Sequence, residues 1–374
     1  MTEHGHEQVV LVADAASGLR AVIAIHSTAL GPALGGIRFW RYPSDEDALC
    51  DALALSEAMT WKAALAGLDQ GGGKAVVLVA DPDAPHPADL LRGLGRAIDE
   101  LGGRYLAAED VGASTADMDA IAAVTPWVTG VRESAGGSGD PSPVTAWGVL
   151  HSMRATLRAL DGPDATLAGQ RVAIQGAGKV GGHLAGLLAA EGAQVAVADT
   201  NRDRADTVAG RVGGHAVGVD AILEQECDVL APCALGGVLD ANTVPRLACR
   251  AVCGAANNQL VGRGVDELLA GRGIVHVPDF VAGAGGIINI AEEFHGYSRA
   301  RALARAATIE ETTAAVLERS RAEGVTPERV ALTLARERVA RDGAGRRWRP
   351  GDPTAWTNGE PLRSLRPAGT VIER

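Results

Sequence analysis

The chain has 374 residues, a formal net charge of −11 and a sequence pI near 5.3. This length exceeds what one hydrophobic core usually supports, so we expect two domains. The acidic balance argues against nucleic acid or an anionic membrane surface as the main partner, and no segment has the pattern of a transmembrane helix.

The first eight residues are polar and lack the basic-then-apolar pattern of an export signal, so we expect a cytoplasmic protein. The cysteines are odd in number and form no C-x-x-C pair, which favours reduced, mostly buried thiols and gives no support for a metal site. They are Cys50, Cys227, Cys233, Cys249 and Cys253.

The N-terminal third begins with two short apolar runs and a long helical pattern. Residues Val9–Val12 and Leu19–Ile25 predict strands joined by a turn. The stretch from Ser44 to Ala66 begins with an acidic cap and repeats apolar residues at helical spacing, so it predicts a long helix that Gly67 ends.

A glycine-rich segment follows that helix. Residues 71–74, three glycines and Lys74, predict a loop before a strand at Ala75–Val79. A helix is predicted at His86–Leu101 and a strand at Tyr105–Ala108. Asp110 comes just after this strand, at the end where open α/β sheets bind their ligands.

Lysine is rare in this chain. Of 35 basic residues only three are lysine, and two of these, Lys62 and Lys74, lie close together among glycines. Arginine stays protonated, whereas a partly buried ammonium group can lose its proton near neutral pH. We therefore take Lys62 and Lys74 as catalytic candidates. The alternative is that they are chance survivors of a codon bias.

The residues around Lys74 do not fit a phosphate-binding P-loop. That motif has glycine six residues before its lysine and Ser or Thr after it, but Leu68 and Ala75 occupy these positions. A plain anion nest remains an alternative. It would not explain the second lysine, Lys62, or the acidic pair Glu109–Asp110.

A linker separates the two expected domains. Residues 136–143 are rich in Gly, Ser and Pro, and a helix is predicted at Thr145–Leu160. We expect one domain over residues 1–140 and a second over residues 141–324, with residues 325–374 completing the first.

A complete dinucleotide-binding fingerprint opens the second domain. The strand Arg171–Gln175 runs into a G-x-G-x-x-G turn, a helix follows, and the strand Gln194–Ala198 ends at Asp199. Such glycines permit a tight turn and close approach of a pyrophosphate at the helix N-terminus. Asp199 would accept ribose hydrogen bonds and repel a 2′-phosphate, so NAD is predicted over NADP, although Arg202 follows closely. The expected cofactor-binding residues here are Gly176, Gly178, Lys179, Val180, Gly181 and Asp199.

Four further strands alternate with helical patterns, as a doubly wound Rossmann sheet requires. They are expected at Ala216–Val219, Asp228–Ala231, Ala251–Cys253 and Ile274–Val277. The stretch after Arg341 is rich in Arg, Gly and Pro without apolar periodicity, which predicts a loosely ordered tail or an interface arm.

Several motifs in order resemble those of the glutamate/leucine/phenylalanine/valine dehydrogenases, and most of all the leucine and valine branch. The motifs are GPALGGIR at 31–38, MTWK at 59–62, GLDQGGGK at 67–74, EDVG at 109–112, AANNQ at 255–259 and GGIIN at 285–289. The resemblance covers residues 8 to 340. It implies a two-domain α/β enzyme, with an N-terminal substrate and oligomerisation domain, that oxidatively deaminates L-amino acids with NAD(P) and forms homo-oligomers.

The resemblance also implies roles for single residues. Lys62 would pair with the substrate carboxylate, Lys74 would activate water as a low-pKa amine, and Asp110 would exchange protons with the substrate amine. Burial and the nearby charge of Lys62 are expected to lower the pKa of Lys74. Further contacts are implied for Gly35 and Gly36 with the substrate, and for Thr145 and Asn257 with the nicotinamide. A turn-forming role is the alternative for Asn257.

The implied side-chain pocket is apolar. Leu34, Ile287 and Ile290 offer no charged partner, so glutamate should be rejected. Alanine at position 108, just before Glu109, resembles the residue found in the leucine and valine branch of the family. Ordinary core packing is the alternative for each aliphatic residue.

Two positions depart from the family pattern. Gly283 stands where relatives have asparagine, and Trp61 where tyrosine is usual. The favoured function is NAD-dependent deamination of a branched-chain or other aliphatic L-amino acid. One alternative is a phenylalanine or unusual-amino-acid dehydrogenase. Another is a catalytically impaired NAD-binding sensor or scaffold, against which the retention of Lys62, Lys74 and Asp110 argues.

Overall fold

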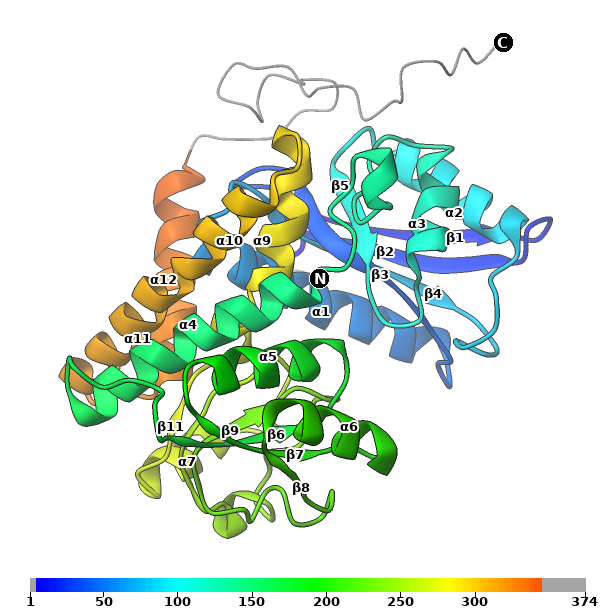
Figure 1. Ribbon diagram of the computed structural model, residues 1–374. Coiled ribbons are helices and arrows are strands. Elements are labelled where there is room, and N and C mark those ends of the chain that lie inside the picture. The colour runs from blue at the N-terminus through cyan, green and yellow to red at the C-terminus, as the bar shows by residue number, and fades with distance from the viewer. Residues whose placement is uncertain (1–4, 345–374) are drawn as a thin grey trace. The chain divides into compact units, whose positions relative to one another are not determined.

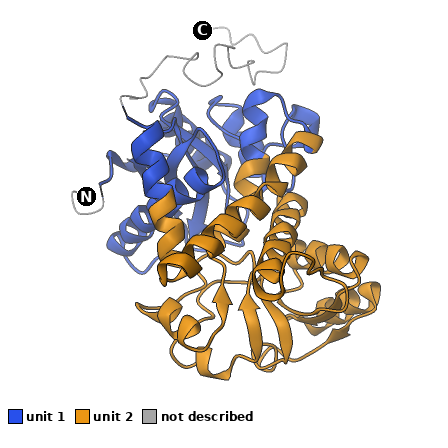
Figure 2. Cartoon of the chain, turned by 90° about the vertical axis from the view of Figure 1, so that its left-hand side faces the viewer, with its two compact units in different colours: residues 1–140, 290–299, 335–374 blue, residues 141–289, 300–334 orange. Residues whose placement is uncertain are grey.

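The computed structural model describes residues 5–344, which form two compact units. Figure 2 colours them separately: unit 1 holds residues 5–140, 290–299 and 335–344, and unit 2 holds 141–289 and 300–334. The chain leaves unit 1 after residue 140, at the expected linker. It returns to unit 1 at residues 290–299 and again from residue 335. The arginine-rich tail beyond residue 344 lies outside the described residues.

Unit 1 is built on a mixed five-stranded sheet of order β1-β2-β4-β3-β5. Strands β1, β2 and β4 are antiparallel neighbours, whereas β3 is parallel to both β4 and β5. The strands are β1 (Gln8–Asp14), β2 (Leu19–Ser27), β3 (Ala33–Trp40), β4 (Gly71–Leu78) and β5 (Tyr105–Glu109) (Figure 1).

Helices cover both faces of this sheet because its central strands have apolar residues on both sides. Val22 and Val76 pack against the long helix α1 (Asp45–Leu65). Ile23 and Ile37 point to the opposite face. There they pack with the apolar residues of α2 (Ala88–Asp99) and α3 (Thr115–Ala122).

The start of the glycine-rich strand was predicted wrongly. Residues 71–74 are not a loop but the first half of β4, which pairs with strands on both sides. Close packing explains the glycines: a Cβ at Gly72 would lie 2.1 Å from the backbone nitrogen of Thr60 in α1, and one at Gly71 would lie 1.8 Å from the Ser27 carbonyl oxygen. Strand β3 was not predicted from the sequence, because Gly35 and Gly36 interrupt its apolar pattern.

Unit 2 has a parallel six-stranded sheet of order β11-β10-β9-β6-β7-β8. This is the doubly wound dinucleotide-binding order, with its switch point between β6 and β9, and it confirms the predicted Rossmann architecture. The strands are β6 (Arg171–Gln175), β7 (Gln194–Ala198), β8 (His215–Ala216), β9 (Cys227–Pro232), β10 (Cys249–Val252) and β11 (Val275–His276).

The remaining helices are numbered in chain order, and Figure 1 labels most of them. They are α4 (Ser142–Asp161), α5 (Lys179–Ala190), α6 (Arg202–Val212), α7 (Val265–Gly271), α8 (Asp279–Ala282), α9 (Gly285–Ala291), α10 (Arg299–Ala307), α11 (Ile309–Glu323) and α12 (Pro327–Asp342). None of the helices in the described part of the chain is long and apolar enough to cross a membrane.

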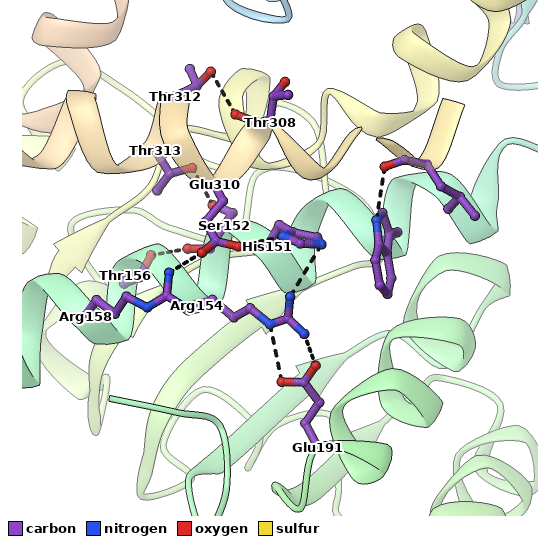
Figure 3. Close-up of polar contacts among 12 residues, drawn as sticks. His151, Ser152, Arg154, Thr156, Arg158, Glu191, Thr308, Glu310, Thr312 and Thr313 are labelled. Atoms are coloured by element: carbon purple, nitrogen blue, oxygen red, sulfur yellow. Dashed lines mark hydrogen bonds and ion pairs between the residues drawn. The ribbon is translucent and has the colours of Figure 1, made fainter. Parts of the chain in front are cut away.

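Helix α4 is fixed to its neighbours by a polar network (Figure 3). His151 Nδ1 lies 2.6 Å from Glu310 Oε2 of α11, and Arg158 pairs with the same carboxylate. Arg154 pairs with Glu191 at the end of α5. Thr145, an expected cofactor contact, lies in the first turn of the same helix.

Candidate active site

The central pair of the site joins two strands that are not neighbours. Lys74 Nζ of β4 donates a 2.7 Å hydrogen bond to Oδ2 of Asp110, which follows β5. Strand β3 lies between β4 and β5, so the two side chains meet across it. A Cβ at Gly36 of β3 would lie 2.5 Å from the Cβ of Asp110. Glycine at position 36 therefore leaves the space in which this pair forms.

Arg38 extends the pair into a charged network that was not predicted from the sequence. Its Nε donates to the same Asp110 Oδ2 at 3.0 Å, and its terminal nitrogen donates to Asp51 Oδ2 at 3.0 Å. Tyr42 also donates to Asp51. The sequence could have indicated this network, because Arg38 lies in the otherwise apolar run of β3. A charged side chain that is partly buried there needs a partner of opposite charge.

Burial and charge set the ionisation of the pair. The Lys74 side chain is 4% exposed, and burial lowers its pKa despite the attraction of Asp110. The charge of Arg38 lowers it further, and the expected contribution of Lys62 stays a prediction. Burial alone would raise the pKa of Asp110, but the charges of Lys74 and Arg38 outweigh burial and lower it. The site thus has an ionised carboxylate beside an amine that deprotonates more easily than an ordinary lysine.

Lys62 lies in the last turn of α1 and is half-buried. Its neighbour Trp61 packs edge-on against His26, with ring centroids 5.3 Å apart, and the guanidinium carbon of Arg336 lies 5.5 Å from the Trp61 ring centroid. The larger ring at position 61 thus contacts α12. Contact of Lys62 with a substrate carboxylate stays a prediction.

Three predicted substrate contacts lie on the strands beside this pair. Leu34 and Ala108 are buried, with 0% and 1% exposure. A Cβ at Gly35 would lie 1.7 Å from the Gly73 carbonyl oxygen, so this glycine is required by strand packing whatever its role toward a substrate.

Helix α9 contains the other two predicted pocket residues. Ile287 is 5% exposed and Ile290 is half-buried. The start of α9 packs on α4: a Cβ at Gly285 would lie 2.3 Å from the Val144 carbonyl oxygen, and one at Gly286 would lie 3.0 Å from Thr145 Oγ1. Paired glycines here bring Thr145 and the first turn of α9 together.

Gly283 precedes that helix at the end of α8. A Cβ at this position would lie 2.8 Å from the Asp279 carbonyl oxygen and 3.4 Å from that of Ala255. An asparagine at this position would therefore require the backbone to shift.

The glycine-rich turn after β6 has the geometry of a pyrophosphate site. Gly176 has a φ of 102°, and a Cβ there would lie 2.8 Å from Ala234 beyond β9. A Cβ at Gly181 would lie 1.9 Å from the Gly176 carbonyl oxygen, whereas nothing lies within 4 Å of one at Gly178. The outer glycines serve the turn and its helix contact, and the middle one faces open space where a ligand can approach. Lys179 and Val180 form the first turn of α5, whose N–H groups suit an anion.

Asp199 lies at the end of β7 and contacts this turn. Its Oδ2 accepts a 2.8 Å hydrogen bond from the Ala177 N–H, and its Oδ1 accepts one from Asn201 at 2.8 Å. The carboxylate is thereby fixed beside the glycines. These residues fit a dinucleotide, with the pyrophosphate at α5 and the ribose at Asp199.

Asn257 lies in the loop after β10, next to Asn258. Among the described residues, Asn258 is the one non-glycine residue with a positive φ, 52°, and its N–H donates a 3.0 Å hydrogen bond to Asp279. Asn257 itself is exposed, and a Cβ at Gly236 would lie 2.0 Å from its carbonyl oxygen. Asn258 therefore adopts the left-handed turn conformation, and both the nicotinamide contact and the turn-forming role of Asn257 stay predictions. In residues 5–344, no group of three or more His, Cys, Asp or Glu is arranged to hold a metal.

Two family profiles match nearly the whole described chain. The Glu/Leu/Phe/Val dehydrogenase dimerisation domain matches residues 6–126, and Glutamate/Leucine/Phenylalanine/Valine dehydrogenase matches 136–202 and 201–343. The chain belongs to this family. It is therefore an amino acid dehydrogenase, an NAD(P)-dependent oxidoreductase, which confirms the resemblance found in its motifs.

Individual relatives agree with this assignment. Valine dehydrogenase from Streptomyces coelicolor is 49% identical over 90% of this chain and 93% of its own length. Leucine dehydrogenase from Bacillus cereus is 45% identical over 91% of this chain and 92% of its own length. The crystal structure of L-tryptophan dehydrogenase from Nostoc punctiforme has a TM-score of 0.81 at 36% identity, covering 92% of this chain and 98% of that one.

The two glycines of the turn should respond differently to alanine. Gly181→Ala should destabilise unit 2 by about 1–3 kcal/mol, because the added methyl overlaps the Gly176 carbonyl oxygen. Gly178→Ala is the matched control: its methyl meets open space, so the Tm should stay near that of the parent while NADH binding weakens. Equal losses of Tm in the two variants would contradict the assigned geometry.

Proposed function

We propose that this protein is an NAD-dependent dehydrogenase of branched-chain or other aliphatic L-amino acids, forming the 2-oxo acid and ammonium. The observation that supports it most strongly is the buried Lys74–Asp110 pair. A buried amine with a lowered pKa beside an ionised carboxylate suits proton transfer near neutral pH.

Each charged residue has a separate task in this proposal. Lys62 binds the substrate carboxylate. Neutral Lys74 accepts a proton from the water that attacks the substrate Cα once hydride has left, and Asp110 takes and returns protons at the substrate nitrogen. Both bonds that Asp110 accepts end on Oδ2, so we expect the amine to approach Oδ1.

NAD supplies the hydride acceptor when bound. Asp199 supports its preference over NADP, because a fixed carboxylate would repel a 2′-phosphate. Arg202 does not offset this charge: it donates to both Asp206 oxygens at 3.1 Å and to the Ala216 carbonyl oxygen at 3.3 Å.

An aliphatic substrate is supported by the side chains proposed for the pocket. Leu34, Ile287 and Ile290 provide no cation for a second carboxylate, and a buried unpaired charge is costly. The higher identity to valine and leucine dehydrogenases than to the tryptophan enzyme favours an aliphatic over an aromatic substrate.

We further propose a cytoplasmic homo-oligomer. Among the described residues the cysteines form no disulfide, as suits a reducing compartment. The match of residues 6–126 to a dimerisation domain supports self-association.

Lys74→Arg should retain the fold and the positive charge but lower kcat by orders of magnitude, because arginine cannot provide a neutral amine. Lys62→Arg is the matched control and should mainly raise the KM of the amino acid. The test follows NADH absorbance with a panel of L-amino acids. Near-normal turnover by Lys74→Arg would rule out its proposed role.

Cofactor choice should follow Asp199. We expect kcat/KM to favour NAD over NADP by at least about tenfold, or about 1.4 kcal/mol. Asp199→Ala should reduce this ratio, and equal use of both cofactors by the parent enzyme would refute the preference.

The substrate profile should follow the apolar pocket. Valine, leucine and similar amino acids should be used in preference to phenylalanine, and glutamate should be nearly inert. One methylene changes binding by only about 1–3 kcal/mol, so valine and leucine should differ modestly. If Ile287 limits the depth of the pocket, Ile287→Ala should shift preference toward larger side chains. An unchanged profile would assign Ile287 to core packing alone.

A further inference from the structure

The loop at residues 254–258, which includes Asn257, is held from inside by one buried amide. Gln259 is fully buried, and its Nε2 donates to the carbonyl oxygens of Gly254 at 3.2 Å and Ala256 at 3.0 Å. These two bonds close the loop. With both Nε2 hydrogens used, Oε1 of Gln259 is left to accept a hydrogen bond.

His276 is the side chain that faces this oxygen. It is 3% exposed, and its Nε2 lies 3.4 Å from Gln259 Oε1. Because the amide oxygen can only accept, the ring must have its hydrogen on Nε2. Burial lowers the pKa of His276 to about 4, so the ring is neutral and its Nδ1 has a lone pair rather than a hydrogen.

Glu328 lies on the other side of the ring. Its Oε2 is 3.9 Å from His276 Nδ1, and both atoms are buried without a hydrogen-bond partner. Burial, and then the negative charges of Asp279 and Asp266, raise the pKa of Glu328 to about 8. At neutral pH the carboxyl group is therefore protonated, and a small rotation of either side chain would let it donate to Nδ1.

We propose that His276 is a positioning residue that couples the protonation of Glu328 to the loop 254–258, and through it to cofactor binding. The proposal rests on the proposed function in one respect, the contact of Asn257 with the nicotinamide. It assigns a role to a chain of three side chains, the buried Gln259 and His276 and the partly exposed Glu328.

Ionisation of Glu328 reverses the hydrogen bonds along this chain. A carboxylate facing Nδ1 favours the tautomer with hydrogen on Nδ1, which leaves a lone pair on Nε2 opposite Gln259 Oε1. Two acceptors then face each other. Gln259 must rotate to relieve this contact, and it thereby loses its bonds to Gly254 and Ala256.

The test measures NAD dissociation constants by calorimetry from pH 6.5 to 9.5, together with the KM of both substrates. Wild-type affinity for NAD should fall at least about threefold as Glu328 ionises near pH 8. Glu328→Gln should abolish that fall, because an amide can donate to Nδ1 at every pH. Glu318→Gln, the same change at an exposed site of α11, is the control and should retain the fall.

Two variants at position 276 distinguish hydrogen-bond donation by His276 from a role in packing alone. His276→Leu should weaken NAD binding about tenfold, since it leaves a buried acceptor without a partner, and should change the amino acid KM much less. His276→Gln restores a donor and should recover most of the affinity without a pH-dependent fall. If His276→Leu does not fold, His276→Gln and Glu328→Gln still test the proposal.

Two results would overturn the inference: an alkaline fall in Glu328→Gln equal to that of wild type, or wild-type affinity in His276→Leu. The binding measurements do not require turnover. An enzyme that oxidises no aliphatic amino acid would refute the proposed function while leaving these measurements informative.

Discussion

The ion pair between Lys74 and Asp110 is the interaction on which the site depends. It joins β4 to the end of β5 across β3, and it can form because position 36 has no side chain. Removing one partner of a buried pair typically costs about 3–5 kcal/mol, because the other charge is left unpaired. The pair thus links the stability of unit 1 to the chemistry proposed for it.

The network around the pair explains why both groups have lowered pKa values. Burial disfavours the protonated form of Lys74, and Arg38 acts in the same direction on Lys74 while it stabilises the Asp110 anion. Asp51 in turn pairs with Arg38 and accepts a hydrogen bond from Tyr42. Such an arrangement maintains a carboxylate that can accept a proton beside an amine that can lose one.

Elements with strong local signals could be predicted from the sequence. The bounds of β6 and β7 match their expected ranges, because an apolar strand, three spaced glycines and a terminal acid leave little freedom. Helix α1 begins after its predicted cap, Ser44, which accepts a hydrogen bond from the Asp47 N–H.

Features that depend on tertiary contacts could not be predicted. Glycines usually interrupt strands, yet Gly72 lies inside β4 because α1 packs too closely for any side chain. Arg38 and Asp110 are 72 positions apart, and no local pattern indicates their pairing. The same holds for His276 and Glu328, whose roles appear only when β11 and α12 are placed side by side.

Arg38 and burial together place Lys74 and Asp110 in their working protonation states. The most direct measurement is the pH dependence of kcat/KM for the amino acid in wild type and Arg38→Gln, with the exposed Arg20→Gln as control. Loss of the Arg38 charge should raise both pKa values, so the acidic limb of the profile should move to higher pH while Arg20→Gln leaves it in place. An acidic limb that stays in place in Arg38→Gln, or moves to lower pH, would contradict the account.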